Sequence, residues 1–420
     1  FVLLLIGTIT LEIDHLLPGN LKFLEGGFYQ GYSLVLDAAA VALVVGVVWA
    51  AVRRWVARPW RIRGKTKSED AWILLVLGLI GITGLLTEAA RISVDGRPDF
   101  ELWSFAGYYL SYLFPFSSAA GAHQVMWIAH VDTFIAFLVM LPTTKLRHAL
   151  TSPANMALAL RDRPTGAMRE MPNLMEATDI ETVGAATVGE FTWKQLFDSD
   201  ACTICGRCTS VCPAHATGKP LDPREIVLKT GEVMARTGTP EVSPPIGVDG
   251  DITVPANWMF DRVTPEELWA CTSCKACDEI CPVNIEILDK ILDMRRYLSL
   301  MESNFPTELG GASRSMQNSG NPWGISQGER ADWADDIEGI TILDGSDPLE
   351  SEWLYWVGCA GSFDDKNKKV TQAMASLLMR AGIDVSILGP AENCTGDPAR
   401  RSGNEYIFQM LAMQNIETLD

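Results

Sequence analysis

The middle of the chain contains two copies of one cysteine motif, CTICGRCTSVCP at residues 202–213 and CTSCKACDEICP at residues 271–282. Each copy has the spacing C-x2-C-x2-C-x3-C-P, and the two copies hold eight of the ten cysteines. Three thiolates separated by two residues can cover one face of a cubic iron–sulfur cluster, whereas the fourth, which precedes a proline, reaches a second cube. The motif therefore predicts a domain with two [4Fe–4S] clusters at residues 196–303.

The spacing assigns three cysteines of one copy and one cysteine of the other copy to each cluster. The two predicted ligand sets are Cys202, Cys205, Cys208 and Cys281, and Cys271, Cys274, Cys277 and Cys212. Two alternatives fit the residues less well. Disulfides are unusual in a cytoplasmic domain, and zinc explains neither the third cysteine at x2 spacing nor the proline after each fourth cysteine.

The segment between Cys212 and Cys271 is 58 residues long, far longer than in compact bacterial ferredoxins. We predict a helix at residues 223–236 and a Pro- and Gly-rich loop at 238–255 within it, and a further helix at 285–301. Helices on both sides of the second copy favour the α-helical type of ferredoxin domain over the β-hairpin type.

Apolar runs crowd the first 150 residues, at 35–52, 71–86 and 124–141. With their flanks, these runs reach the roughly 20 residues that a helix needs to cross a hydrocarbon layer of about 30 Å. We therefore predict an α-helical transmembrane domain at residues 1–150. The run at 1–11 is too short to cross, and because the chain begins with Phe, we expect it to be the end of a helix whose start is absent.

Charge divides the chain at about the same place. The 52 acidic and 34 basic side chains give a formal charge of −18, but residues 1–150 carry a net +1 and residues 151–420 a net −19. Binding to nucleic acid needs a basic surface, so we expect no nucleic acid partner. The acidic surface has two interpretations, a solvated surface that favours solubility or a field that steers a partner with a basic docking patch.

Basic residues in and just after the predicted membrane domain gather at 53–67 and 145–163. The positive-inside rule places these loops, and the cysteine-rich part that follows, in the cytoplasm. The aromatic segment 102–116 must then be an interfacial or re-entrant segment, because a further crossing would put residues 145–147 outside. We expect a multi-pass protein in contact with membrane lipid, followed by a cytoplasmic linker at 151–195.

Four of the five histidines lie in the first 150 residues, namely His15, His123, His130 and His148. A histidine inside a membrane is a candidate functional residue. On a continuous helix, His130 and His148 would share a face about 27 Å apart, which suits one haem near each membrane surface. A b-type haem takes an axial ligand from each of two helices, so His15 could partner His130, and His123 faces the same way. Interfacial histidines without metal are the alternative.

Three acidic residues, Asp37, Glu88 and Asp132, lie near the predicted outer ends of the membrane helices. A carboxyl group there could exchange protons with a quinone. For Glu88, an ion pair with Arg91 at a helix end is the alternative.

The last part of the chain has an α/β pattern over residues 351–420, with predicted strands at 352–357 and 384–388 and a helix at 370–381. A polar segment at 304–350, rich in Gly, Ser, Asn and Asp, is expected to be a linker with ordered loops at NPWG (321–324) and RADW (330–333).

The remaining two cysteines, Cys359 and Cys394, lie in this α/β part. Here the sequence resembles the first half of the cysteine-rich CCG module of heterodisulfide reductases. That module has a C-C-G element where this chain has Asn393-Cys394-Thr395-Gly396, so a further iron–sulfur cluster and a structural role both remain open. The closing C-x-x-C of the module would fall beyond Asp420, and we expect the sequence to be a fragment of its gene product at both ends, with the CCG domain incomplete.

The stretch from His130 to Pro153 resembles the last helix of the membrane cytochrome b subunit of respiratory nitrate reductase. The resemblance implies that His130 and His148 bind haem b. The first membrane segment departs from that family, because only His15 is present and Leu5 stands ten residues before it. One haem or two are therefore expected.

The order of the parts, with CTGDPARRSGNE at 394–405, resembles the membrane-bound heterodisulfide-reductase-like proteins of bacteria. The resemblance implies an electron-transfer flavoprotein:menaquinone oxidoreductase in the plasma membrane, in which electrons pass from the reduced flavoprotein through two [4Fe–4S] clusters and haem b to menaquinone. A quinol-linked heterodisulfide- or sulfite-reductase-type subunit and a non-catalytic electron-relay subunit are the alternatives. The expected fold is multidomain, with an α-helical transmembrane cytochrome b-like domain, an α-helical ferredoxin domain and an α/β CCG domain.

Overall fold

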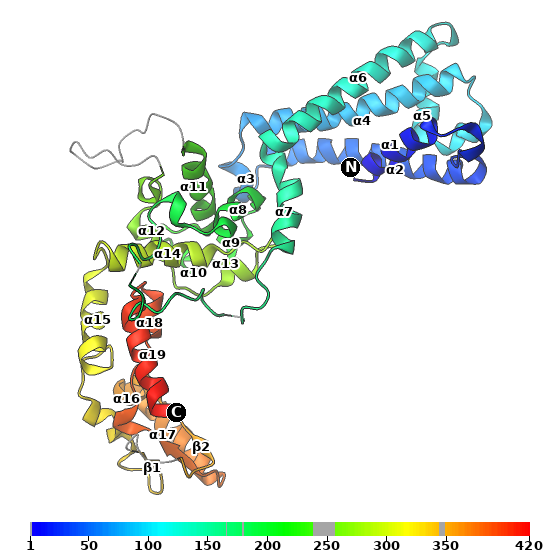
Figure 1. Ribbon diagram of the computed structural model, residues 1–420. Helices are drawn as coiled ribbons and strands as arrows, with labels where there is room; N and C mark the ends of the chain where they lie inside the picture. Colours follow the sequence, from blue (N-terminus) through cyan, green and yellow to red (C-terminus); the bar gives the residue numbers. More distant parts are fainter. Residues whose placement is uncertain (1, 165, 179, 238–256, 344–348) are drawn as a thin grey trace, which may run out of the picture. The chain divides into compact units, whose positions relative to one another are not determined.

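The computed structural model describes residues 2–164, 166–178, 180–237, 257–343 and 349–420. The chain forms two compact units, Phe1–Thr151 and Ser152–Asp420, and both are built mainly from helices (Figure 1). The predicted loop at 238–255 lies outside the described residues.

The first unit is a set of long apolar helices. Its helices are α1 (Val2–Leu16), α2 (Gly26–Ala51), α3 (Trp60–Arg63), α4 (Ser68–Val94), α5 (Phe105–Leu110), α6 (Phe116–Thr143) and the start of α7 (His148–Ala157). Among the described residues, three helices are long and apolar enough to cross a membrane, namely α2 with its π-helical extension to Ala57, α4 and α6. Each contains one of the predicted spans, and α4 packs against both of the others.

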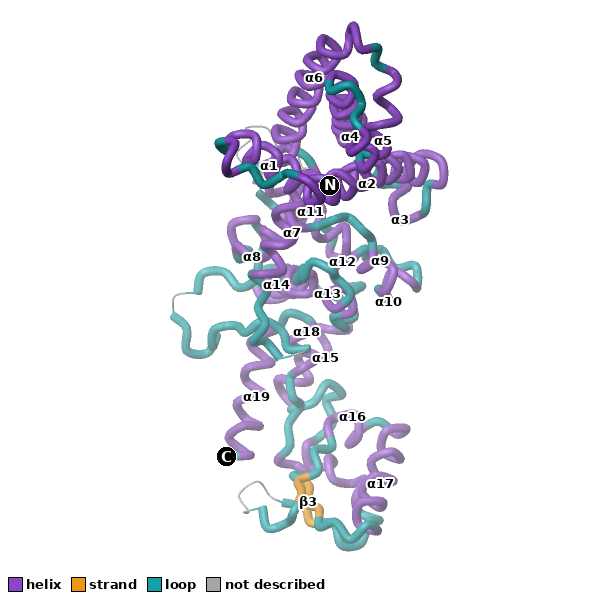
Figure 2. Tube along the Cα trace, turned by 90° about the vertical axis from the view of Figure 1, so that its right-hand side faces the viewer, coloured by secondary structure: helices purple, strands orange, loops and turns teal. Residues whose placement is uncertain are grey.

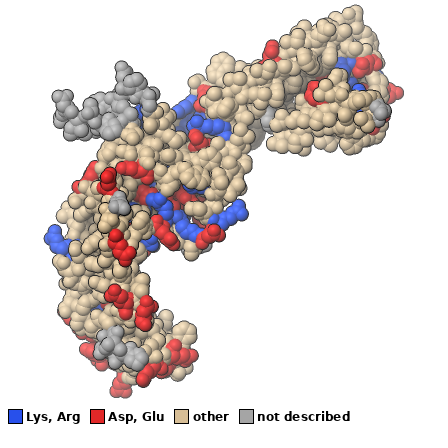
Figure 3. Space-filling model, viewed as in Figure 1, with Lys and Arg blue, Asp and Glu red and all other residues tan. Residues whose placement is uncertain are grey.

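The surface of these helices is suited to lipid rather than water. Large apolar side chains such as Val48, Trp49 and Val139 are 58%, 70% and 62% exposed. A contiguous apolar surface of this kind marks a membrane or partner contact. Figure 3 shows few charged atoms over the long helices of this unit, whereas acidic atoms are frequent on the second unit in the same view.

The aromatic segment 102–116 does not form a membrane-spanning helix. It folds into a 3-10 turn (Asp99–Trp103), the short helix α5 and a second 3-10 turn (Ser111–Leu113). Helix α5 packs against α2 and α4. The first amides of α5 are held by the buried carboxylate of Asp37, which accepts from the N–H groups of Ala106 (2.5 Å) and Gly107 (3.3 Å).

The expectation of one continuous helix through His130 and His148 is wrong. Helix α6 ends at Thr143, and Thr144 is extended, with φ −121° and ψ −177°. The Thr144 hydroxyl accepts from the Leu146 N–H and begins a 3-10 turn that leads into α7. The carboxylate of Glu69 accepts from the Lys145 N–H at 2.6 Å and holds the chain at this break. His148 is therefore the first residue of a separate helix.

The ferredoxin part of the second unit is helical, as predicted. Its helices are α8 (Trp193–Ala201), α9 (Arg207–Val211), α10 (Pro213–Ala216), α11 (Pro223–Arg236), α12 (Pro265–Trp269), α13 (Ala276–Glu279) and α14 (Ile287–Leu300). The predicted helices at 223–236 and 285–301 correspond to α11 and α14. Helix α14 is buried along nearly its whole length, and its apolar residues join those of α11 and α12 in the main core of the unit.

The last part of the chain is an α/β module around a small sheet. It contains α15 (Thr307–Ser319), a 3-10 segment (Gln327–Ala334), α16 (Gly358–Phe363), α17 (Asp365–Arg380), α18 (Asp397–Arg401) and α19 (Glu405–Leu419). Strands β1 (Thr341–Ile342), β2 (Trp353–Leu354) and β3 (Val385–Ile387) form a parallel sheet in the order β1-β3-β2. Figure 2 shows this short sheet beside α17, in a molecule otherwise made of helices and loops.

The segment 304–350 is not the linker that its composition predicts. Strand β1 lies within it and pairs with β3, with Thr341 opposite Ser386. Met316 packs in a core with Cys359 and Cys394, and Trp333 packs in another with Ile387. A few apolar residues in a polar sequence are enough to anchor this segment, because each is almost completely buried.

Candidate functional site

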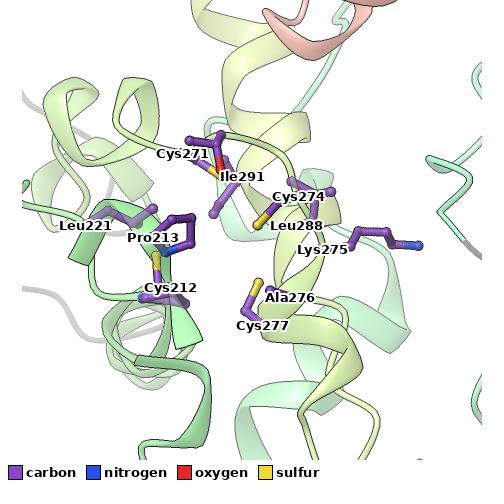
Figure 4. Close-up of a pocket in the computed structure, with 12 residues that line it drawn as sticks. Cys212, Pro213, Leu221, Cys271, Cys274, Lys275, Ala276, Cys277, Leu288 and Ile291 are labelled. Carbon is purple, nitrogen blue, oxygen red and sulfur yellow. The ribbon is translucent and has the colours of Figure 1, made fainter. Parts of the chain in front are cut away.

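Two pockets in the ferredoxin part are lined by cysteine. Cys202, Cys205, Cys208 and Cys281 line the first pocket. Cys271, Cys274, Cys277 and Cys212 line the second pocket, where Cys274 and Cys277 point their sulfur atoms into the space that separates them from Cys212 (Figure 4). Each pocket thus combines three cysteines of one motif copy with the last cysteine of the other, which is the grouping that the spacing predicts.

The two cysteine loops repeat one unusual backbone conformation. Ile204 and Ser273 occupy equivalent positions and have φ values of 55° and 56°, and Gly206 and Lys275, also equivalent, have 73° and 60°. A left-handed conformation costs a residue other than glycine about 1–2 kcal/mol. Because three different side-chain types accept this cost at matching positions, the conformation is imposed by the site, where it turns the loop back around its pocket.

The walls of both pockets are mostly apolar. Val227, Ile285 and Ile287 line the first pocket, and Leu221, Leu288 and Ile291 line the second. Burial raises the pKa of Cys202 to about 11 and that of Cys208 to about 12. Without a metal, these thiols hold their protons at neutral pH, and iron must displace them. Sulfur donors in a mostly apolar pocket suit an iron–sulfur cluster.

A buried charge cluster lies beside the first pocket. The Asp198 carboxylate accepts from Lys194 (2.6 Å) on its own helix and from Lys290 (2.6 Å) on α14. Burial alone would raise the pKa of Asp198, but the two ammonium groups outweigh burial and hold this pKa below its usual value. Asn155 on α7 donates to Asp198 (3.0 Å) and to the Val283 carbonyl (2.8 Å). The far end of α7 is therefore fixed next to this pocket.

The structure also brings Cys359 and Cys394 together in the core of the CCG module. The buried Arg330 donates from one nitrogen to Cys359 Sγ (3.4 Å) and to Glu392 (2.6 Å). A hydrogen bond from the Cys394 thiol, assisted by Arg330, lowers the pKa of Cys359 although burial opposes the shift. Asn393, at the position of the missing cysteine, instead accepts from Gln327 (2.7 Å). Arg330 lies in the RADW motif, the only sequence signal that singled it out.

In the first unit, His130 packs against α4. Thr83 donates its hydroxyl proton to the Leu79 carbonyl at 2.6 Å and lies 3.0 Å from His130 Nδ1. In the tautomer with the proton on Nδ1, the Thr83 hydroxyl accepts from Nδ1–H and Nε2 carries the free electron pair. A Cβ atom at Gly84 would lie 3.2 Å from the imidazole, so glycine makes room for this ring. Neither Thr83 nor Gly84 could be recognised from the sequence.

The other three histidines of the first unit have surroundings that differ from those of His130. His148 Nδ1 hydrogen-bonds to the Lys145 carbonyl, which also leaves its Nε2 free. His15 is exposed at the end of α1, a helix that packs on α2. His123 is half-buried on α6, seven residues before His130. No hydrogen bond joins His15 and His130 among the described residues.

The three acidic candidates have different surroundings. Asp37 is engaged by the first amides of α5. Glu88 lies against α5, where a Cβ at Gly107 would come within 2.9 Å of its carboxyl carbon. Arg91, expected as a partner of Glu88, pairs instead with Glu101 at 2.8 Å. Asp132 is exposed on α6.

Comparison with known protein families matches three parts of the chain in this order. The nitrate reductase gamma subunit family matches residues 23–161, the 4Fe-4S dicluster domain matches 201–286, and the cysteine-rich (CCG) domain matches 353–420. An EtfAB:quinone oxidoreductase of Syntrophomonas wolfei is 34% identical over 94% of the chain. In the order of these parts, the chain is similar to the membrane-bound, heterodisulfide-reductase-like iron–sulfur proteins. Its predicted fold class is confirmed, and it combines a membrane domain with an iron–sulfur domain.

Two further relatives extend the comparison. A probable iron-sulfur-binding oxidoreductase of Bacillus subtilis, FadF, is 31% identical over the whole chain. A subunit of the dihydromethanophenazine:CoB–CoM heterodisulfide reductase of Methanosarcina acetivorans is 24% identical over 54% of the chain and 54% of its own length. The chain spans 59% of the length of the Syntrophomonas protein and 63% of that of FadF. No solved structure matches it.

Proposed function

We propose that the chain conducts electrons in the bacterial plasma membrane, from reduced electron-transfer flavoprotein through two [4Fe–4S] clusters and haem b to menaquinone. The observation that carries this proposal is the pair of crossed cysteine pockets on a chain with a nitrate-reductase-gamma-like membrane domain. The name of the Syntrophomonas relative supports both the flavoprotein donor and the quinone acceptor. The cysteine-rich unit is assigned to the cytoplasm.

The proposed cluster ligands are the two crossed sets of cysteines that line the pockets. Each cluster would supply a one-electron carrier. The protein's part is to exclude water with the apolar walls and to hold the sulfurs in place through the left-handed loop residues. Cys359 and Cys394 are proposed as the site nearest to the donor, with a further cluster or a thiol pair as its content.

The proposed haem ligands are His130 and His148, each through Nε2. Thr83 and the Lys145 carbonyl hold the two rings in the tautomer that leaves Nε2 free, as hydrogen-bonding partners of ligating histidines commonly do. Haem would supply a one-electron carrier in the membrane. His15 and His123 remain the candidates for further ligands.

The contacts within the second unit support an order for the two pockets. Helix α18, which follows Cys394, reaches the second cysteine loop, where Arg401 donates to the Ser273 carbonyl at 2.8 Å. The first pocket is instead the one that borders α7, through Asn155. We therefore propose that electrons enter at the CCG module and pass the second pocket before the first.

Reduction of menaquinone takes up two electrons and two protons. Because Asp37 is engaged as a cap for α5, Glu88 and Asp132 are the acids that we propose for proton delivery.

The test uses the full-length protein with an acyl-CoA, its dehydrogenase and electron-transfer flavoprotein, and follows the haem α-band. We expect the haem to be reduced only when the flavoprotein is present, and to be reoxidised by a menaquinone analogue. Failure of either step would contradict the proposal. Reoxidation by a disulfide substrate instead of quinone would favour the heterodisulfide reductase alternative, and a requirement for a further protein chain would favour the relay alternative.

A further inference from the structure

Arg295 on α14 is a buried cation that pairs with no acidic side chain in the described part of the chain. Its side chain is 3% exposed, and none of the ion pairs among the described residues includes it. The guanidinium donates to the carbonyls of Leu268 (2.6 and 3.0 Å), Cys271 (2.6 Å) and Arg401 (2.7 Å) and to Ser273 Oγ (3.1 Å). Its hydrogen bonds are therefore satisfied, but every acceptor is uncharged.

The neighbouring buried cations, unlike Arg295, form ion pairs with acidic side chains. Arg296, the next residue, pairs with Asp293 (2.8 Å) and Glu405 (3.1 Å), and Lys290, one turn earlier, pairs with Asp198 (2.6 Å). Burial of a charge is costly unless an opposite charge compensates it. A buried guanidinium that is fully hydrogen-bonded, yet paired with no acidic side chain among the described residues, points to a counter-charge of another kind.

The second pocket is where such a counter-charge would lie. Cys271, whose carbonyl accepts from Arg295, lines this pocket, and Ser273 belongs to the same loop. An iron–sulfur cluster bound by four thiolates is negatively charged, and each electron that it accepts adds one more negative charge. A fixed cation beside it stabilises the reduced form and raises its reduction potential.

We infer that Arg295 is the counter-ion of the second cluster and sets its reduction potential. The inference rests on the proposed ligand set of the second pocket. Arg295 is a positioning residue in this role, because it acts on the cluster through the Cys271 loop and through its field.

The segment after Cys394 seals this charge from water. The Arg401 carbonyl accepts from Arg295, and Ser299 on α14 donates to the Ser402 carbonyl at 2.6 Å. Gly403, with φ 83°, packs so closely that a Cβ there would lie 2.5 Å from the Arg295 backbone. A charge excluded from water acts more strongly on its neighbours than a hydrated one. The CCG module thus contributes to the electrostatics of the ferredoxin cluster that it borders.

The test is a redox titration of the two clusters in the full-length holoprotein, followed by electron paramagnetic resonance. In Arg295→Gln, we expect the potential of one cluster to shift to more negative values while the other stays unchanged. Arg295→Lys keeps the charge and should hold the potential near that of the wild type. The matched control is Arg401→Gln. Arg401 is also a cation hydrogen-bonded to this loop, but its side chain is 41% exposed and pairs with Asp397. Its expected shift is smaller.

Unchanged potentials in an Arg295→Gln protein that carries both clusters would overturn the inference. A shift in Arg295→Lys as large as that in Arg295→Gln would also overturn it, because hydrogen-bond geometry rather than charge would then be responsible. If Arg295→Gln does not assemble the second cluster, Arg295→Lys decides: assembly with the wild-type potential supports the inference, and a shifted potential contradicts it. A wild-type protein without two cluster signals would instead refute the proposed ligand sets.

Discussion

The ferredoxin pockets and the Cys359–Cys394 pair are both buried sulfur sites, but they differ in what surrounds the sulfur. In the pockets, apolar walls and burial raise the pKa of thiols such as Cys208. In the CCG module, Arg330 and the neighbouring thiol lower the pKa of Cys359. The pockets therefore gain most from a metal that replaces the protons, whereas the protein itself polarises Cys359.

The largest expected effect comes from breaking one crossed pocket. Cys281→Ser should abolish the same cluster signal in electron paramagnetic resonance as Cys202→Ser, and Cys212→Ser the same signal as Cys271→Ser, because each pocket shares its fourth cysteine with the other motif. Iron and acid-labile sulfide per chain should fall in parallel. Cys394→Ser is the control and should keep both ferredoxin signals. Loss of the same signal in Cys281→Ser and Cys271→Ser would disprove the crossing.

The next largest effect concerns the ion pair of the CCG module. Arg330→Met leaves the carboxylate of Glu392, which is 1% exposed, without its partner. Removing one member of a buried pair lowers the free energy of unfolding by about 3–5 kcal/mol. We therefore expect this module to unfold at a lower urea concentration, and hydrogen exchange of residues 357–363 at increasing urea concentrations measures this midpoint. The double variant with Glu392→Gln should recover part of the loss. A single variant within about 0.5 kcal/mol of the wild type, the range of ordinary surface substitutions, would contradict this prediction.

A third buried site, around His130, extends the contrast to the membrane domain. An added Cβ at Gly84 would lie 3.2 Å from the imidazole of His130, and Gly84→Val adds two further methyl groups there. We therefore expect the ring to be displaced and the amount of haem per chain to fall severalfold. The absorbance of the reduced haem measures this loss. Gly46→Val on α2, where no atom lies within 4 Å of an added Cβ, should keep its haem. Equal haem in both variants would count against His130 as a ligand.

A smaller effect is expected from acid on the ferredoxin domain. The pKa of Asp198 is below its usual value in the folded chain, so its ion pairs stabilise the fold above the unfolded pKa of about 3.9. That stability is lost as the pH falls through the lower folded pKa. Urea midpoints should therefore drop in acid for the wild type and less steeply for Asp198→Asn. Asp397→Asn, in an exposed pair, should retain the wild-type profile.

The smallest effect concerns the acidic surface of the second unit. If this surface steers the flavoprotein, the association rate should decrease with ionic strength, because salt screens exposed charges. Stopped-flow reduction of the clusters at several salt concentrations measures this rate. A rate that is independent of salt would leave solubility as the role of the surface.

Sequence alone predicted the features that local patterns encode. The crossed grouping of eight cysteines follows from spacing, and the three membrane helices follow from the length of their apolar runs. The module built from residues 304–350 could not be predicted, because strand β1 has two residues and its anchors Met316 and Trp333 are isolated in a polar segment. Thr83 and Arg295 were missed, and Arg330 was predicted only as part of an ordered loop, since each acts on a site through contacts with residues distant in the sequence. The break before His148 was missed because it is held by the Thr144 cap and by Glu69, which is distant in the sequence.

The crossed pockets have a consequence for the synthesis of the protein. When the ribosome has made Cys208, the first pocket still lacks Cys281, which follows 73 residues later. The second pocket has its earliest cysteine, Cys212, long before the other three. Neither pocket has all four of its cysteines until almost the whole domain has left the ribosome. Both clusters would therefore be inserted late and at nearly the same time.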